Sequence, residues 1–246
     1  MHFQNENSFE VEKKIAISPI AILPIGAVEA HGPHLPLGTD NILAERLAEK
    51  VAARTNAFVL PTLPFGQIWS LKNFPGSINV SNESLISFLI DIGTSLYEQG
   101  FKIFVMLNGH LGNAVALKEA ARKLYQLHHD FKILYLFYPG TSKIVSEVRE
   151  SESVHGSYFH ACEIETSYML YLAEDYVDMK KAITDMPNIP LSADVMPTPW
   201  EEFTTSAVLG DAKLASKEKG EKIISIAIEN MVTLIEGAIN ATRTSN

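Results

Sequence analysis

The feature of this sequence that most constrains its fold is a regular alternation of short apolar runs with longer segments of helical spacing. The runs 20–25 and 102–107 consist almost entirely of aliphatic and aromatic residues, and each is followed by a glycine or an asparagine. Runs without polar alternation are typical of parallel strands that are buried on both faces. Between them, residues 41–55 repeat apolar side chains at the spacing of one helix face. The alternation predicts an α/β fold with a mostly parallel sheet and helices on both of its faces.

The remaining elements follow from the same patterns. Residues 82–99 end at Gly100, a common C-terminal stop for a helix. The stretch 179–205 carries several prolines, and we expect it to form an irregular arm, here called the proline-rich arm. No repeat or linker divides the sequence, so we expect one domain over residues 1–246. The expected strands are 20–25, 57–63, 102–107 and 131–137, and the expected helices are 41–55, 82–99, 114–127, the latter part of 154–176, and 213–238.

Composition excludes several classes of protein. The net charge is −9, and no cluster of lysine and arginine is long enough to follow a phosphate backbone, so we expect no nucleic-acid partner. We also expect no membrane partner, because we find no apolar run of the ~20 residues that a span requires. Cys162 is the single cysteine, which suits a reducing compartment. With a polar N-terminal segment, these features lead us to expect a cytoplasmic protein.

The first cluster of reactive side chains directly follows the run 20–25. Glu29, His31 and Asp40 lie within twelve residues of one another, in a stretch rich in glycine and proline. Open parallel sheets bind ligands beyond the carboxyl ends of their strands. Imidazole and carboxylate groups together suit Zn²⁺, Mn²⁺ or Fe²⁺ better than Ca²⁺. The alternative interpretation is a solvated loop with isolated histidines.

Two further clusters come later in the chain. His110 directly follows the run 102–107, where it can reach the same crevice, although a helix-capping turn would explain the segment too. In the third cluster, His160 is followed closely by Glu163 and Glu165. Acids are also favourable at the N-terminus of a helix, where they complement its dipole, so both roles stay open for these two residues.

The number of available ligands favours a site for two metal ions. Two cations that share one bridging carboxylate need about five or six protein groups, with positions left for water. A thiol alternative is weak, because the acids around Cys162 should raise the pKa of its thiol. The three clusters supply five ligands: Glu29, His31, Asp40, His110 and Glu165.

Three stretches resemble, in the same order, the signatures of the creatininase (creatinine amidohydrolase) family. They are PIGAVEAHGPHLPLGTD at 24–40, NGHLGN at 108–113 and HACEIETS at 160–167. FPGS at 74–77 and VLGD at 208–211 resemble two shorter family segments. Together the matches extend over most of the chain.

The resemblance implies an α/β domain whose two-metal centre hydrolyses cyclic or linear amides. It implies Glu29 and His110 as ligands of one metal, His31 and Glu165 as ligands of the other, and Asp40 as the bridge. His160 would supply a proton or polarise the substrate. The resemblance also implies a homo-oligomer, often a hexamer in this family, to which the proline-rich arm could contribute contacts.

Two departures from the creatininase pattern argue against creatinine as the substrate. Creatininases carry an acid two residues after the histidine of the second signature, and this chain has Gly112 there. Their tryptophan-rich substrate wall has no counterpart beside His160 in the sequence, because the chain has only Trp69 and Trp200.

We therefore expect a di-metal amidohydrolase that cleaves a C–N bond in a small molecule, such as a cyclic amide or formamide. In this hypothesis a metal-activated hydroxide attacks, backbone N–H groups near 109–112 hold the oxyanion, and His160 or Glu163 protonates the leaving nitrogen. Three alternatives remain: a formamide hydrolase acting on a pyrimidine nucleotide intermediate, a peptidase of the same family, and a metal-binding regulatory or scaffold protein.

Overall fold

A four-stranded sheet lies at the centre of the computed structural model, which describes residues 1–156 and 158–243. Its spatial order is β2-β1-β3-β4, and each neighbouring pair runs parallel. β1 and β3 pair along their whole lengths, and each of their residues is buried, which explains their continuous apolar composition. The strands are β1 (Ile20–Ile25), β2 (Phe58–Val59), β3 (Ile103–Asn108) and β4 (Lys132–Leu136).

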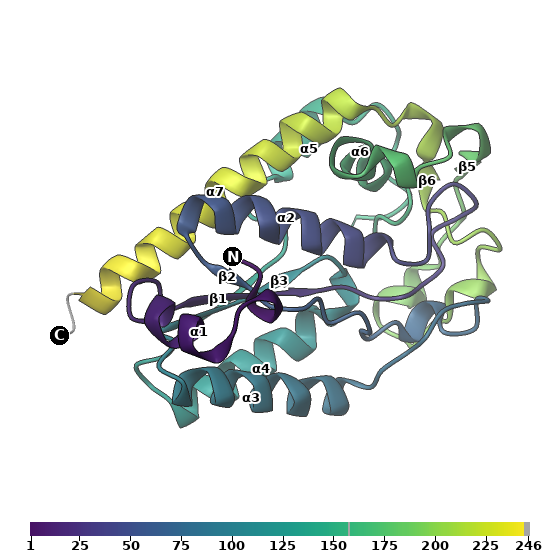
Figure 1. Cartoon of the computed structure of the whole chain (residues 1–246). Helices are drawn as coiled ribbons and strands as arrows, with labels where there is room; N and C mark the ends of the chain where they lie inside the picture. Colours follow the sequence, from purple (N-terminus) through teal and green to yellow (C-terminus); the bar gives the residue numbers. More distant parts are fainter. Residues whose placement is uncertain (157, 244–246) are drawn as a thin grey trace.

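Helices cover both faces of this sheet (Figure 1). Successive side chains of β1 alternate between two cores, with Ile20 and Ile22 in one and Ala21 and Leu23 in the other. Helices α2, α6 and α7 close the first core, and α1, α3 and α4 close the second. The predicted α/β class and the mostly parallel sheet are therefore confirmed. The helices are α1 (Ser8–Ile15), α2 (Thr39–Thr55), α3 (Asn82–Glu98), α4 (Ala114–Leu127), α5 (Ser142–Val148), α6 (Glu163–Leu172) and α7 (Lys217–Arg243).

Several boundaries differ from the expected ones. β2 has two residues, whereas the sequence predicts a strand over 57–63, because Pro61 and Pro64 interrupt regular pairing and leave an isolated bridge between Leu63 and Ile25. The last helix is preceded by a separate 3₁₀ turn at Ala212–Leu214. Helices α1 and α5 are additions that the sequence patterns did not indicate.

The proline-rich arm contains only short elements, as its composition predicts. They include the two-residue strand β5 (Thr184–Asp185), which pairs antiparallel with β6 (Gly210–Asp211). The short 3₁₀ helices of the molecule are η1 (Phe3–Asn5), η2 (Trp69–Leu71), η3 (Leu111–Asn113), η4 (Glu174–Tyr176), η5 (Met179–Lys181), η6 (Leu191–Asp194), η7 (Trp200–Glu202) and η8 (Ala212–Leu214).

Helix α7 is longer and more apolar than the sequence analysis expected of any segment. By length and composition alone, residues Lys217–Ala241 of α7 could cross a membrane. In the structure α7 packs against α2 and α6, and Ile223, Ala227 and Met231 are fully buried in the first core. This helix therefore has the packing of a core helix with one exposed side.

Candidate metal centre

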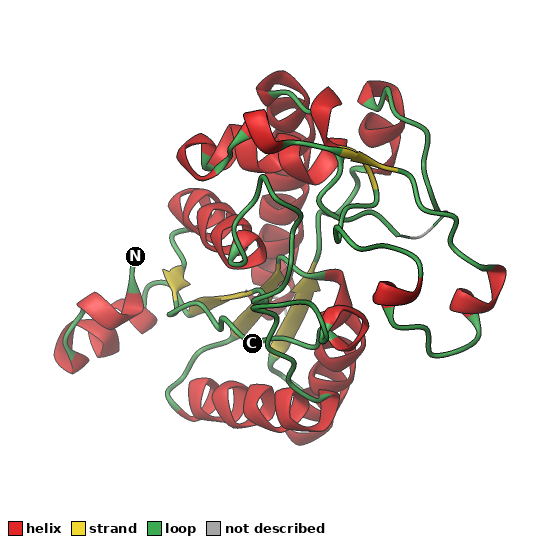
Figure 2. Cartoon of the chain, turned by 90° about the vertical axis from the view of Figure 1, so that its right-hand side faces the viewer, coloured by secondary structure: helices red, strands yellow, loops and turns green. Residues whose placement is uncertain are grey.

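The five predicted ligands gather at the carboxyl edge of the sheet, on the side that faces the viewer in Figure 2. Glu29 and His31 lie in the loop after β1, and His110 follows β3. Asp40 is the second residue of α2, and Glu165 is the third residue of α6. Because parallel strands end at the same edge, side chains that are far apart in the sequence converge there.

A buried asparagine connects the loops that carry these residues. Asn113 Nδ2 donates to the carbonyl of Gly26 at 3.0 Å and to Asn108 Oδ1 at 3.2 Å. Asn113 Oδ1 accepts the N–H of Gln67 at 2.9 Å. These hydrogen bonds tie together the loops that follow β1, β2 and β3.

The loop after β3 approaches α2 closely. The N–H of Gly109 donates to the carbonyl of Ile25 at 2.8 Å. A Cβ at position 109 would lie 2.2 Å from the carbonyl oxygen of Asp40, so only glycine allows this approach. The missing side chain thereby lets His110 reach Asp40.

The acids and imidazoles form three groups of possible ligands, of which one joins His160 to Glu29 and His31 and the other two share Asp40. In the first of these two, His110 Nδ1 lies 3.1 Å from Glu29 Oε1 and 3.1 Å from Asp40 Oδ2. In the second, His31 Nε2 lies 3.3 Å from Asp40 Oδ1 and 3.7 Å from Glu165 Oε2. The ligand atoms of each group lie within 4.8 Å of one another. The two oxygens of Asp40 thus face different groups, as a bridging ligand requires.

The burial of these groups fits the binding of cations. Glu29, His31 and Asp40 are each 1 % exposed. Among the described residues, both carboxylate oxygens of Glu29, His31 Nε2 and Asp40 Oδ2 are buried without a hydrogen-bond partner. Because uncompensated buried charge is costly, this cluster needs positive charge, which two divalent ions would supply.

In their neutral forms, two histidines present an unprotonated nitrogen to the cluster. His31 Nδ1 donates to the carbonyl of Glu29 at 3.2 Å, and His110 Nε2 donates to the carbonyl of Gln67 at 2.8 Å. A carbonyl only accepts, so the proton of each neutral ring lies on the outer nitrogen. The inner nitrogens, His31 Nε2 and His110 Nδ1, are then free to bind metal, which is the usual tautomer of histidine ligands.

The electrostatics of the metal-free cluster lead to the same conclusion. Burial by itself lowers the pKa of His31, but the charges of Asp40 and Glu165 outweigh it and raise that pKa well above its usual value. Burial likewise lowers the pKa of His110, and the charge of Glu29 helps to raise it well above the usual value. Without metal, the carboxylates therefore draw protons onto the histidines as a substitute for cations.

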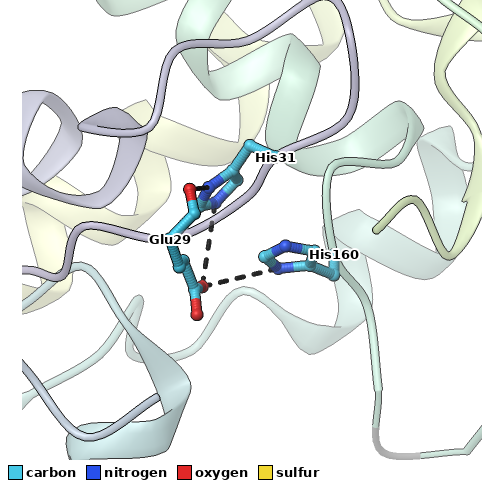
Figure 3. Close-up of side chains that lie close together, drawn as sticks. All are labelled: Glu29, His31 and His160. Atoms are coloured by element: carbon cyan, nitrogen blue, oxygen red, sulfur yellow. Dashed lines mark hydrogen bonds and ion pairs between the residues drawn. The ribbon is translucent and has the colours of Figure 1, made fainter. Parts of the chain in front are cut away.

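His160 lies beside Glu29 and His31 at the edge of this cluster (Figure 3). Its Nε2 donates to the carbonyl of Ala30 at 2.7 Å, so Nδ1 carries no proton in the neutral ring. Nδ1 lies 3.7 Å from Glu29 Oε1, and the ring centroid is 4.3 Å from that of His31. This position is compatible with the proton-transfer role that the family resemblance implies for His160.

Glu163 does not reach the cluster, in contrast to the expectation that it is a candidate proton donor. Its fully buried carboxylate accepts from the N–H of Glu150 at 3.0 Å and from the N–H and hydroxyl of Ser151 at 2.9 Å and 2.7 Å. Lys219 of α7 also donates to it. Burial by itself raises the pKa of Glu163, but Lys219 and the other donors hold it below its usual value. The residue is thus a buried anion that ties a loop to α7.

A cavity of about 190 Å³ opens beside the acidic cluster. Glu29, Asp40, His110, His160 and Glu165 form part of its lining. The rest comes from the loops after β2 and β3, the end of β4, the segment before α6 and the proline-rich arm. A substrate in this cavity would lie in contact with the predicted metal site.

The sequence analysis missed the aromatic residues of the cavity lining, among them Trp200. Trp200 lies in the proline-rich arm, forty residues beyond His160, yet its ring meets the ring of His160 edge-on at 5.4 Å between centroids. A tryptophan therefore does lie beside His160 in the structure, although none is near it in the sequence. No local pattern marks Trp200, because the fold of the arm alone brings it to the cavity.

Comparison with known proteins identifies the family of this chain. The family described as creatinine amidohydrolase matches residues 4–235. Creatinine amidohydrolase of Pseudomonas putida is 30% identical over 240 residues, with 92% of each chain covered. A mycofactocin precursor peptide peptidase of Mycolicibacterium smegmatis is 28% identical over 219 residues, covering 84% of this chain and 80% of the relative. A 3-dehydro-scyllo-inosose hydrolase of Thermotoga maritima is 24% identical over 257 residues, covering 96% and 82%.

Solved structures show the same fold with metals. A zinc–zinc form of a creatininase variant and a manganese form of creatininase each superpose with a TM-score of 0.87 at 26% identity. Each comparison covers 96% of this chain and 97% of the other. With a family match over nearly its whole length and a relative at 30% identity, this chain belongs to the creatininase family of metal-dependent amidohydrolases.

Proposed function

We propose that this protein hydrolyses an amide-type C–N bond, in a cyclic amide, formamide or related small molecule, with two divalent ions bound at the cluster. Membership of the family makes it a metal-dependent hydrolase. The observation that carries the finer proposal is the position of Asp40, whose two oxygens face two separate ligand groups beside a small cavity.

The residues divide into two ligand sets. Glu29 and His110 would hold one ion, His31 and Glu165 would hold the other, and Asp40 would bridge them. When bound, the two ions would polarise the substrate carbonyl and make a water molecule nucleophilic near neutral pH.

The side chain that manages the proton is His160. Its Nδ1 faces Glu29 at the floor of the cavity, and its Nε2 donates to the carbonyl of Ala30. It is therefore oriented to take a proton during attack and to return it to the departing nitrogen. Glu163 is excluded from this step, because its carboxylate is bonded to Lys219 and Ser151.

Backbone N–H groups of the loop after β3 would hold the oxyanion, but fewer of them are available than the range 109–112 suggests. The N–H of Gly109 donates to Ile25, and the N–H of His110 donates to Asn108 Oδ1. The role therefore falls to the amides of Leu111 and Gly112, which line the cavity.

We further propose that the ions are Zn²⁺, Mn²⁺ or Fe²⁺ and that the protein acts in the cytoplasm as a homo-oligomer, for which a hexamer is the working hypothesis. The mixed imidazole and carboxylate ligands support these metals. Relatives whose structures are zinc and manganese forms support the first two. The single cysteine supports a reducing compartment.

The nucleotide alternative has less support. Among the described residues that line the cavity, none is a lysine or an arginine, so a phosphate group would have no cationic side chain to pair with. A scaffold without activity would not require an open cavity beside the ligands.

Metal analysis combined with an amide panel tests the proposal. The purified protein should contain about two ions per chain and should hydrolyse at least one cyclic amide or formamide, and it should lose that activity on exhaustive chelation and regain it with metal. Full turnover after complete metal removal would contradict the metal mechanism. Metal binding without turnover of any amide would favour the scaffold alternative.

A further inference from the structure

The part of the cavity beyond the metal ligands has a wall made almost wholly of aromatic and aliphatic side chains. They come from η2, from the end of β4, from the segment before α6 and from η7. A volume of about 190 Å³ is below the ~300–1,000 Å³ typical of sites for drug-sized ligands, so it suits a small substrate. The wall residues are Trp69, Leu71, Phe137, Tyr158, Phe159 and Trp200.

Charged side chains are confined to the floor of this cavity. The acids and histidines that line it are those of the cluster, and the other polar side chains among the described lining residues are neutral, such as Gln67 and Ser70. The nearest lysine in the sequence, Lys72, is exposed and packs over the Trp69 ring at 5.0 Å. A charged group on the substrate would therefore lose its hydration against the wall without gaining a partner.

Trp200 is held in the wall by contacts on several sides. Its ring lies 5.4 Å from that of His160 and 5.9 Å from that of Tyr158. The Tyr158 hydroxyl donates to the carbonyl of Ala193 at 3.3 Å, which fixes the proline-rich arm against the segment before α6. The neighbouring Glu201 accepts a hydrogen bond from Asn73, just beyond η2. The indole is thus placed between His160 and Tyr158 in the wall of the cavity.

We propose that the substrate is an uncharged amide that carries a planar aromatic ring, and that Trp200 is the residue that selects for this ring. The proposal rests on the hydrolase function above, because the wall selects only what the metal site then cleaves. Aromatic rings prefer to pack against other aromatic rings in offset or edge-on arrangements, and this wall offers several such faces next to the reactive groups. The neutral wall at the same time disfavours a carboxylate or phosphate on the ring.

Three formamides of similar intrinsic reactivity test the substrate class with the metal-loaded full chain. They are N-benzylformamide, N-(4-carboxybenzyl)formamide and N-methylformamide, which differ in the presence of a ring and of a charge. We expect kcat/KM for N-benzylformamide to exceed that for each of the other two by about tenfold or more. If all three are cleaved with similar kcat/KM, or the carboxylated one is preferred, the substrate class is wrong while the hydrolase function stands.

The tryptophans provide a readout that does not depend on turnover. Trp69 and Trp200 are the only two in the chain, and both line the cavity. Binding of N-benzylformamide should therefore change the intrinsic fluorescence, and in the single-tryptophan variant Trp69→Phe the change should persist. If no formamide is cleaved but this change occurs, the aromatic site stands and the proposed reaction is wrong. If neither occurs, both proposals are wrong.

Variants at position 200 separate selection from general damage. Trp200→Ala should raise KM for N-benzylformamide about tenfold and leave KM for N-methylformamide within about twofold, and Trp200→Phe should restore most of the loss. Phe88→Ala, which removes an exposed aromatic side chain of α3 outside the cavity, should change neither value. Equal losses for both substrates in a folded Trp200→Ala protein would overturn the role of Trp200.

Discussion

Asp40 and His160 lie close together but have different predicted roles, Asp40 as the bridging metal ligand and His160 as the group that transfers protons. Asp40 is 1 % exposed and offers one oxygen to each group of ligands, so both ions would depend on it. His160 approaches Glu29 through Nδ1, and its Nε2 donates a hydrogen bond to the carbonyl of Ala30. The two side chains should therefore fail in different ways when they are removed.

We expect Asp40→Ala to lose both ions, because a bridging ligand serves two cations at once. His160→Ala should retain about two ions per chain and lose about 10²- to 10⁴-fold in kcat, the usual contribution of a positioned acid–base group. Metal content per chain, measured beside steady-state kinetics, distinguishes the two. If His160→Ala loses a metal while Glu165→Ala keeps both, the two residues have been assigned the wrong roles.

Glu163 illustrates a buried charge that serves the fold. Its carboxylate and Glu150 share the ammonium of Lys219, but Glu163 is fully buried whereas the side chain of Glu150 is 64% exposed. Breaking a buried pair leaves an uncompensated charge, whereas an exposed pair contributes little.

We expect Glu163→Gln to lower the free energy of unfolding by about 3 kcal/mol, and the matched Glu150→Gln to lower it by less than about 1 kcal/mol. Urea denaturation at neutral pH measures both values. The folded Glu163→Gln protein should keep its metals and most of its kcat. A variant of unchanged stability that loses its activity would instead restore Glu163 as a proton donor.

At the scale of elements, the packing of α6 against α7 determines where Glu165 lies. Gly220 of α7 sits so close to α6 that a Cβ there would be 1.9 Å from the carbonyl oxygen of Ser167. Ser167 lies only two residues beyond Glu165, so any separation of the helices moves a predicted ligand.

We expect Gly220→Ala to cost about 1–3 kcal/mol of stability through overpacking and to weaken metal binding as α6 shifts. Gly237→Ala is the matched control in the same helix, because its Cβ would meet nothing within 4 Å. The control should be as stable as the parent protein or slightly more so, since alanine favours helix. Thermal unfolding and metal titration of both variants test this, and similar behaviour of the two would show that the close contact is unimportant.

At the scale of the whole molecule, the centre joins segments that span residues 29 to 165. The loop after β1, the start of α2, the loop after β3 and the start of α6 each carry a predicted ligand. Ions bound there would link the loops after β1 and β3 to helices α2 and α6. Their binding free energy would add to the stability of the folded state.

We expect removal of the ions by a chelator to lower the midpoint of thermal unfolding by roughly 10 °C. The reason is that ions at saturating concentration stabilise the folded state by several kcal/mol, and each kcal/mol shifts the midpoint of a chain of this size by a few degrees. The Asp40→Ala protein should unfold at the same temperature with and without chelator, because it has no ions to lose. Differential scanning calorimetry on both proteins measures the shift. A parent protein that is indifferent to the chelator despite proven metal loss would contradict the cross-linking role.

Local patterns in the sequence were sufficient to predict the α/β class, most strands and helices, and the segments that carry Glu29, His31, Asp40, His110 and Glu165. The reason is that burial on both faces of a strand leaves a continuous apolar run, and such strands end at one common edge. The motifs after two of these runs therefore already indicated a shared crevice.

Only the tertiary structure decided the order of the strands, which ring nitrogen of each histidine faces the cluster, the partner of Glu163 and the place of Trp200. Each of these depends on which distant segments meet: Glu163 finds Lys219 of α7, and Trp200 reaches His160 through the fold of the proline-rich arm. Periodicity along a chain reports how deeply a residue is buried but not what it is buried against. For that reason the reactive groups could be predicted from the residues, whereas the aromatic wall of the cavity emerged only from the packing.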